Sequence, residues 1–304
     1  MTRRRVLVLG CGGFLGGTVT ARLSELPGAR VLRGGRSPGH DLTADLATVP
    51  VHTLARDLAA LGPDVVVDCA GLVGGPATAL CEVNARGPAA LCEAMALAAP
   101  SARLVHLGSA AEYGAAEPGT ALTESAATRP TGVYGAAKLA GTLAVAGSGL
   151  DAVVLRVFNP VGAGAPASGL PGRLATAFRD APGDGTVRTG SLAAHRDFVH
   201  VRDVAEAVAL AVTTPGPLPP VVNIGSGRAT QVRTLARELA ELSGFGGRIE
   251  ESGGGSERSA EVSWHQADIA LAASALGWRP ARTLRDALTA LWETASGRPA
   301  GVTP

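Results

Sequence analysis

This chain of 304 residues lacks several features that would assign it to other classes of protein. Lys and Arg together number 27, yet Lys138 is the only lysine. A net charge of +1 without a basic block argues against electrostatic binding of nucleic acid. No run of about 18 apolar residues occurs, and the short apolar run at the N-terminus leads into glycines, unlike a signal peptide. We therefore expect a cytoplasmic protein that does not enter a membrane.

Cysteine and histidine are also sparse. The four cysteines show no C-x-x-C spacing, and the six histidines form no H-x-x-x-H pair. This excludes the usual sequence signals of a disulfide framework or a zinc site, so we expect no metal. The cysteines, which we expect to be reduced packing residues, are Cys11, Cys69, Cys81 and Cys92.

The clearest pattern at the start of the chain is an apolar run followed by glycines. Val6–Leu9 is continuously apolar and predicts a buried strand, and Thr18–Leu26 has helical character. The glycines between them are Gly10, Gly13 and Gly16, while position 15 is Leu, so the pattern is G-x-x-G-x-x-G and not G-x-G-x-x-G. Glycines between a strand and a helix let the backbone approach a pyrophosphate at the helix N-terminus. The stretch predicts a nucleotide site, although a plain turn is the alternative.

The end of the second predicted strand, Ala29–Leu32, bears on the choice of cofactor. In dinucleotide folds an acidic residue here accepts the ribose hydroxyls of NAD, whereas an arginine accommodates the 2′-phosphate of NADP. No Asp or Glu occurs between Leu26 and Asp41, and Arg36-Ser37 could bind a phosphate. This favours NADP(H), with NAD(H) possible; an exposed loop in an Arg-rich protein is the other interpretation.

Strands and helices alternate through the first half of the chain. Further strands are expected at 65–67, 103–107 and 152–157, with an Ala-rich helix over 77–98. The alternation predicts an α/β fold with a doubly wound parallel Rossmann sheet. We expect an NAD(P)-binding domain over 1–160 and a smaller, mainly substrate-binding domain over 161–304, of which about 190–225 returns to the first. Within the second part we expect helices over 173–179, 201–212, 232–242, 269–276 and 284–295, and strands at 186–189 and 221–224. The glycine-rich stretch 252–256 is either a hinge or lid or a plain linker.

Tyr134 and Lys138 form the most suggestive pair of side chains. A spacing of four places them on one helix face. A nearby cation favours the phenolate and lowers the pKa of a tyrosine, as a phenolic acid/base requires. Tyr-x-x-x-Lys also occurs by chance in helices, but here it contains one of two tyrosines and the only lysine.

Seven motifs, in order, resemble the extended short-chain dehydrogenase/reductases, in particular the sugar-nucleotide epimerase/dehydratase branch. They are Gly10-x-x-Gly13-Phe14-Leu15-Gly16, the serine motif at 109–114, Tyr134-x-x-x-Lys138, 155–162, 196–204, 223–227 and 276–280. The resemblance implies that Ser109, Tyr134 and Lys138 are catalytic. Tyr134 would be the acid/base, Ser109 would hold the same substrate oxygen, and Lys138 would bind the nicotinamide ribose.

The resemblance also assigns binding residues and a homodimer formed through the helices that carry Asn84 and Tyr134. Residues implied for the cofactor are Gly10, Gly13, Phe14, Leu15, Gly16, Arg36, Ser37, Asp41, Leu42, Cys69, Ala70, Gly71, Asn84, Tyr134, Lys138 and Phe158. Residues implied for a nucleoside-diphosphate sugar are Ser109, Asn159, Arg173, Arg196 and Arg258. Bidentate contacts from arginine suit a diphosphate.

Two departures from the family pattern narrow the predicted reaction. Dehydratases carry Asp-Glu where this chain has Ala110-Ala111, so 4,6-dehydration is not expected. Gly35 replaces the acidic residue typical of NAD binding, which fits net reduction with NADPH better than an epimerase that retains NAD. We predict an NADP(H)-dependent 4-ketoreductase of a nucleotide-linked deoxysugar, in secondary metabolism such as antibiotic biosynthesis. The alternatives are an NAD-dependent 4-epimerase, a ketoreductase of another small secondary-metabolite ketone, and a non-catalytic dinucleotide sensor.

Overall fold

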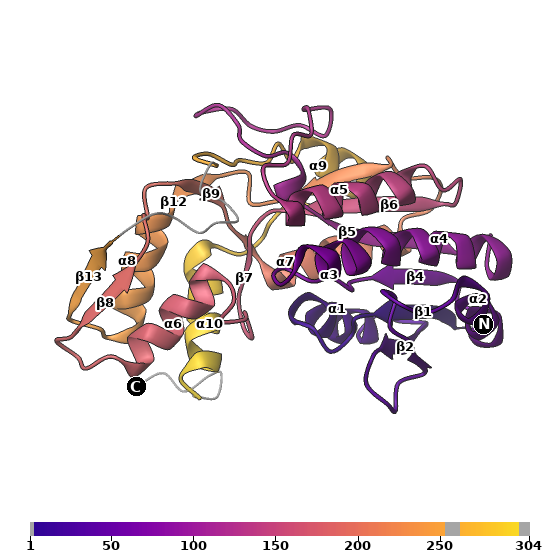
Figure 1. The fold of residues 1–304 in the computed structure, drawn as a ribbon, viewed down its shortest axis with the longest axis horizontal. Helices are drawn as coiled ribbons and strands as arrows, with labels where there is room; N and C mark the ends of the chain where they lie inside the picture. Colours follow the sequence, from indigo (N-terminus) through magenta and orange to yellow (C-terminus); the bar gives the residue numbers. More distant parts are fainter. Residues whose placement is uncertain (1–2, 253–261, 298–304) are drawn as a thin grey trace.

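A parallel sheet of seven strands is the centre of the computed structural model, which describes residues 3–252 and 262–297 (Figure 1). In spatial order the strands are β11 (Val221–Ile224), β6 (Ala152–Val157), β5 (Arg103–Ser109), β4 (Val65–Asp68), β1 (Arg4–Leu9), β2 (Ala29–Gly35) and β3 (Leu42–Thr43). The predicted doubly wound Rossmann fold is confirmed. The strand order reverses between β1 and β4, and folds of this type bind ligands at the carboxyl ends of the strands beside such a reversal.

The middle strands are apolar because helices cover both faces of the sheet. On one face α1 (Phe14–Ser24) and α7 (Val201–Thr213) share a hydrophobic core with alternate strand residues such as Val6 and Val8. On the other face α2 (Val51–Leu61), α4 (Gly87–Ala98) and α5 (Val133–Ala146) pack on Leu7 and its neighbours. Strands buried on both sides read as continuous apolar runs, which is the pattern that Val6–Leu9 shows.

The structure corrects the sequence prediction at four points in the first half of the chain. Helix α1 begins at Phe14, not Thr18, so Gly16 lies inside its first turn. The sheet has a further edge strand, β3, and α2 was not predicted. The helix expected over 77–98 is divided into α3 (Ala77–Cys81), a π-helical turn (Glu82–Arg86) and α4. Such π-turns within helices occur frequently at functional sites.

A smaller lobe lies beside the sheet, on the left in Figure 1. Its core is formed by α6 (Leu170–Asp180), α8 (Val232–Ser243) and α10 (Leu284–Ala295). Three short pairings accompany it: β8 (Thr186–Thr189) with β13 (Arg248–Glu251), β9 (His195–Asp197) with β12 (Ala229–Gln231), and β7 (Pro160–Val161) with β10 (Val199–His200). Helix α9 (Ala270–Leu276) packs near β11 and α7. The division into two domains at residue 160 stays a prediction. Of the stretch 252–256, predicted as a hinge, lid or linker, only Ser252 lies within the described residues.

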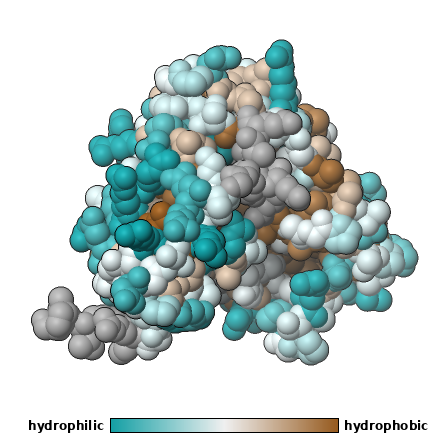
Figure 2. Space-filling view, turned by 60° about the vertical axis from the view of Figure 1, so that its left-hand side comes forward, coloured by the Kyte–Doolittle hydropathy of each residue, from teal (hydrophilic) through white to brown (hydrophobic). Residues whose placement is uncertain are grey.

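Hydrophilic residues predominate on much of the surface in Figure 2, and the hydrophobic residues gather mainly in its right half. Among the described residues, no helix combines the length and apolar character needed to cross a bilayer.

Candidate active site

The glycine turn between β1 and α1 is shaped by close backbone contacts. Gly10 has φ +72°, and a Cβ there would lie 2.9 Å from the Ala70 nitrogen. A Cβ on Gly16 would lie 2.0 Å from the Gly10 carbonyl oxygen, so no larger residue fits. Gly13 is the N-cap of α1 and has no side chain to satisfy the first helical N–H groups. This arrangement fits an anionic pyrophosphate at the helix N-terminus, as predicted for the cofactor.

The loop after β4 packs against this turn and is held by Asn84. Asn84 Oδ1 accepts a hydrogen bond from the Leu72 nitrogen at 3.1 Å, and Nδ2 donates to the Leu72 carbonyl at 2.7 Å. Asn84 is buried in the π-turn, and a Cβ on Gly71 would lie 3.4 Å from its Oδ1. Cys69 donates its N–H to the Leu9 carbonyl, which continues the sheet into the loop. Asn84 therefore positions the predicted cofactor loop; direct contact of Asn84 with a cofactor stays a prediction.

His40 is a residue at the end of β2 that sequence reasoning missed. Arg36 and Ser37 are exposed there, as phosphate ligands should be. A Cβ on Gly35 would lie 3.0 Å from His40 Cδ2 and 3.2 Å from Nε2, and Nε2 is 3.7 Å from Cys11 Sγ. The imidazole thus occupies the space into which an acidic side chain at position 35 would project. Of the other two residues predicted here, Asp41 accepts the Arg33 N–H and Leu42 is buried.

Ser109, Tyr134 and Lys138 lie on two elements that pack closely. Ser109 is the last residue of β5 and the N-cap of the 3₁₀ turn Ala110–Glu112. Tyr134 is the second residue of α5, and Lys138 follows one turn later. A Cβ on Gly135 would lie only 2.4 Å from the Ala111 carbonyl oxygen. Glycine beside Tyr134 therefore lets α5 approach the turn that follows Ser109.

Lys138 is almost completely buried, at 4% exposure. Its Nζ donates to the Leu107 carbonyl at 2.5 Å, which leaves further N–H donors of the ammonium group for a second partner. Burial lowers the pKa of Lys138, while the negative charges of Asp68 and Glu112 oppose that shift. The predicted effect of Lys138 on the pKa of Tyr134 stays a prediction.

A buried Asp–His pair close enough to Lys138 to interact with its charge was also missed by sequence reasoning. His106 Nδ1 is 2.8 Å from Asp68 Oδ2, and both side chains are at most 1% exposed. Burial lowers the pKa of His106, and the positive charge of Lys138 lowers it further. The sequence offered little signal, because the two residues lie on different strands and are 38 positions apart.

The predicted substrate residues are only partly brought together. Asn159 Nδ2 donates to the Asp197 carbonyl at 2.9 Å, next to Arg196. The Arg196 guanidinium is buried and donates to the carbonyls of His195 and Val262. Arg173 is exposed on α6. Arg258 lies outside the described residues.

Phe158, which was predicted to contact the cofactor, is fully buried between Tyr113 and His265. We therefore expect any cofactor contact to use its main chain.

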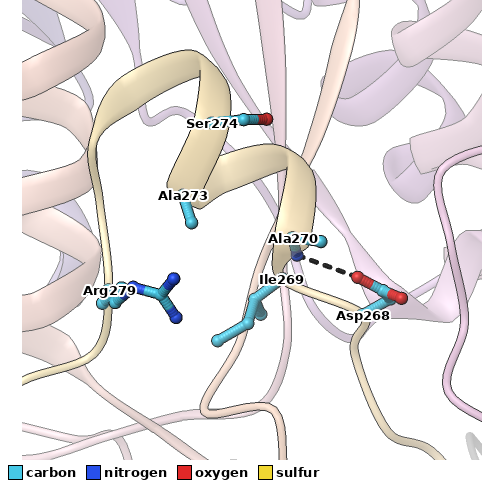
Figure 3. A pocket seen from close by; sticks show the side chains of 6 residues that line it. All are labelled: Asp268, Ile269, Ala270, Ala273, Ser274 and Arg279. Carbon is cyan, nitrogen blue, oxygen red and sulfur yellow. Dashed lines mark hydrogen bonds between the residues drawn. The ribbon is translucent and has the colours of Figure 1, made fainter.

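The cavity in Figure 3 is separate from these residues. It has a volume of about 500 Å³ and is lined by residues of α9 and its flanks, with Arg279 directed toward Ile269. A neighbouring cavity of about 580 Å³ adds Thr123, Glu124 and Ser125. Neither is lined by Ser109, Tyr134 or Lys138. The candidate active site is therefore identified by the chemistry of its side chains and by its place at the carboxyl end of β5 in the central sheet.

Within 3–252 and 262–297, no group of three or more His, Cys, Asp or Glu side chains is arranged to hold a metal ion.

Buried histidines should make the fold sensitive to acid. His265 is buried beside the Gly114 carbonyl, to which its Nε2 donates at 2.6 Å, and burial lowers its pKa to about 4. In the unfolded chain its pKa is about 6.5, so between these values the unfolded state binds the proton and the native state does not. Stability therefore falls as the pH falls from about 6.5 to 4, by about 3 kcal/mol for this residue.

Denaturant unfolding of the wild type and His265→Gln across this pH range measures the effect. The variant keeps an N–H donor but cannot titrate, so it should lose less stability than the wild type on acidification. Parallel losses in the two proteins would contradict this assignment.

This chain is similar to known proteins in both sequence and fold. The sequence model described as NAD dependent epimerase/dehydratase family matches residues 6–225. A dTDP-6-deoxy-L-talose 4-dehydrogenase (NAD(P)+) from Kitasatospora kifunensis is 38% identical, covering 97% of this chain and 96% of the relative. A UDP-glucose 4-epimerase from Streptomyces lividans is 34% identical over 72% of this chain and 70% of the relative. The structure of MoeE5 in complex with UDP-glucuronic acid and NAD superposes with a TM-score of 0.81 at 27% identity, over 95% of this chain and 98% of that one.

Proposed function

Because this chain belongs to the NAD dependent epimerase/dehydratase family, we propose that it reduces the 4-keto group of a nucleoside-diphosphate deoxysugar with NADPH. The observation that carries the proposal is the close packing of the Ser109 turn against the helix that bears Tyr134 and Lys138. The similarity to a 4-dehydrogenase of a dTDP-sugar supports both the position and the substrate class, since reduction of a 4-keto group is that reaction in reverse.

The chain's own residues supply proton transfer and orientation. Tyr134 donates its phenolic proton to the keto oxygen as the carbonyl carbon becomes a carbinol. Ser109 holds the same oxygen through its hydroxyl group. Lys138, fixed at the Leu107 carbonyl and one helical turn beyond Tyr134, supplies a positive charge that favours the phenolate left on Tyr134. The nicotinamide cofactor supplies the hydride.

We assign the cofactor to the carboxyl ends of β1 and β4, where the strand order reverses. The glycine turn and the first N–H groups of α1 hold the pyrophosphate, and the loop clamped by Asn84 forms the adjoining wall. Arg36 and Ser37 bind the 2′-phosphate at the end of β2, where Gly35 supplies no carboxylate and His40 fills the adjacent space. This arrangement favours NADP(H) over NAD(H).

Removal of Arg36 tests this choice of cofactor. A hydrogen bond to a charged group contributes about 1.5–3 kcal/mol, so Arg36→Ala should weaken NADPH binding by about 10- to 100-fold. Binding of NADH, which lacks the 2′-phosphate, should change little. Titration of the wild type and the variant with both dinucleotides measures this, and equal losses for the two would count against Arg36.

A second candidate is 4-epimerisation of a nucleotide sugar. The specific observation in its favour is the Leu155–Gly162 stretch, which resembles the corresponding motif of UDP-galactose 4-epimerases, together with the similarity to the Streptomyces lividans epimerase. An epimerase regenerates its bound NAD in each cycle, whereas a reductase releases oxidised cofactor. Reduction of a different small ketone and a non-catalytic sensing role stay predictions without a supporting contact in the structure.

The fate of the cofactor separates these candidates. Purified protein should carry little tightly bound NAD(H), and it should consume one equivalent of added NADPH for each 4-keto sugar nucleotide reduced. Mass spectrometry of co-purified ligands and absorbance at the reduced nicotinamide band measure both quantities. Stoichiometric bound NAD with interconversion of 4-epimers and no NADPH consumption would favour the epimerase.

We also propose a homodimer formed by the outer faces of α4 and α5. Leu97 on α4 is 71% exposed and Leu143 on α5 is 63% exposed, and a second copy would cover them. The cytoplasmic location and a place in deoxysugar or antibiotic biosynthesis stay predictions.

A further inference from the structure

We propose that Glu112 is a positioning residue that fixes the Ser109 turn to the helix carrying Tyr134 and Lys138. The inference rests on the proposed function, because it concerns how the side chains of that reaction are held. Glu112 is fully buried, with an exposure of 0%, at the end of the 3₁₀ turn that begins after Ser109.

The Glu112 carboxylate joins three elements of the site. Its Oε1 accepts the Ser109 main-chain N–H at 2.7 Å and the Thr142 hydroxyl at 2.9 Å. Its Oε2 accepts Arg156 Nε at 2.7 Å. Thr142 lies on α5, one turn beyond Lys138, and Arg156 lies on β6. A single carboxylate thus connects the end of β5, the catalytic helix and the neighbouring strand.

The charges in this cluster are balanced within the protein. Arg156 also stacks on the Tyr113 ring, with its Cζ 4.7 Å from the ring centroid. Burial alone would lower the pKa of Arg156, but Glu112 and Tyr113 outweigh it and raise the pKa above its ordinary value. A carboxylate with three donors, one of which is a paired cation, is costly to remove, and its geometry is restrictive. Glu112 is therefore suited to hold a fixed separation between elements.

Glu112 does not replace the acid that Ala110 and Ala111 lack. Its two oxygens face Ser109 N–H, Thr142 and Arg156, and the group is closed to solvent. Its effect on the reaction comes through the Ser109 hydroxyl, whose main chain it holds. Displacement of a reacting group by about 1 Å can cost about 10²-fold in rate.

Thr142→Val tests the connection with little disturbance of the core. The substitution keeps the shape and removes one of the two bonds to Oε1. We expect kcat for the keto sugar to fall by about 10-fold, with KM and the NADPH dissociation constant unchanged. Thr142→Ser keeps the hydroxyl group and should restore kcat. Glu112→Gln, which also removes the charge facing Arg156, should lower kcat by about 10²-fold if it folds.

Asp203→Asn is the matched control, because Asp203 is likewise an almost fully buried carboxylate paired with an arginine, Arg282. It has two main-chain N–H donors, where Glu112 has one main-chain N–H and one hydroxyl group. The substitution should lower the melting temperature but leave kcat unchanged. Wild-type kcat in Thr142→Val, or an equal loss of kcat in Asp203→Asn, would overturn the inference.

Hydrogen exchange at the Ser109 amide tests whether Glu112 holds this turn, independently of whether the proposed reaction is correct. The Ser109 amide should exchange faster in Thr142→Val and Glu112→Gln than in the wild type and Asp203→Asn. If the wild type reduces no keto sugar, the proposed function fails, and this exchange measurement still decides whether Glu112 holds the Ser109 turn. Unchanged exchange in both variants would overturn the inference by itself.

Discussion

Tyr134→Phe should lower kcat by about 10²- to 10⁴-fold, because it removes the phenolic proton from the proposed reaction. The ring itself is retained, so the packing of α5 and the binding of the sugar nucleotide should change little. Tyr134 is half-buried near the start of α5, where Gly135 allows close approach to the turn after Ser109. Steady-state kinetics with NADPH and a 4-keto sugar nucleotide measures the loss.

Tyr113, the other tyrosine, provides a matched control. It is buried, and its hydroxyl group donates to Asn223 Oδ1 at 2.7 Å. Tyr113→Phe should lose about 1 kcal/mol of stability and keep kcat near that of the wild type. If Tyr134→Phe turned over at the wild-type rate, the acid/base assignment would be wrong.

Lys138→Arg should also abolish most activity, although it preserves the positive charge. Lys138 is 4% exposed and reaches the Leu107 carbonyl with a compact ammonium group. A planar guanidinium is larger and has donors in a fixed fork, so it cannot occupy the same space without moving α5. Movement of about 1 Å is enough for a loss of about 10²-fold in kcat/KM.

Two further variants separate size from charge at this position. Lys138→Met keeps the length without the charge and should be at least as impaired as Lys138→Arg. Arg237→Lys, an exposed exchange of the same two residue types on α8, should have wild-type activity. Near-normal kcat/KM in Lys138→Arg would mean that the single lysine has no special role.

The sequence was sufficient to predict the fold wherever a pattern is local. The strand–glycine–helix unit at 6–16 and the Tyr134–Lys138 spacing depend on neighbours within one or two turns, and long apolar strands such as β6 are equally recognisable. Strand β8 and helix α10 have the predicted boundaries. The α/β class and the family resemblance are confirmed.

The omissions have physical reasons of two kinds. Helix α2 has apolar residues at positions 51, 54, 58 and 61, so its helical pattern was present in the sequence and was overlooked. Strand β3 has two residues, too few to show a period. The Glu112 cluster could not be predicted, since its partners are 30 and 44 residues away and meet only after β5, α5 and β6 have packed. The Asp68–His106 pair depends on strand register in the same way.

Transfer of deuterium from NADPH that carries deuterium at both hydrogen positions of nicotinamide C4 tests the proposed reaction most directly. The labelled cofactor and a 4-keto nucleoside-diphosphate sugar are incubated with the enzyme, and the product is analysed by mass spectrometry and NMR. We predict one deuterium on C4 of the sugar for each NADPH oxidised, in a single configuration. A C4 alcohol without deuterium, or epimers formed while the labelled NADPH remains unconsumed, would contradict the account.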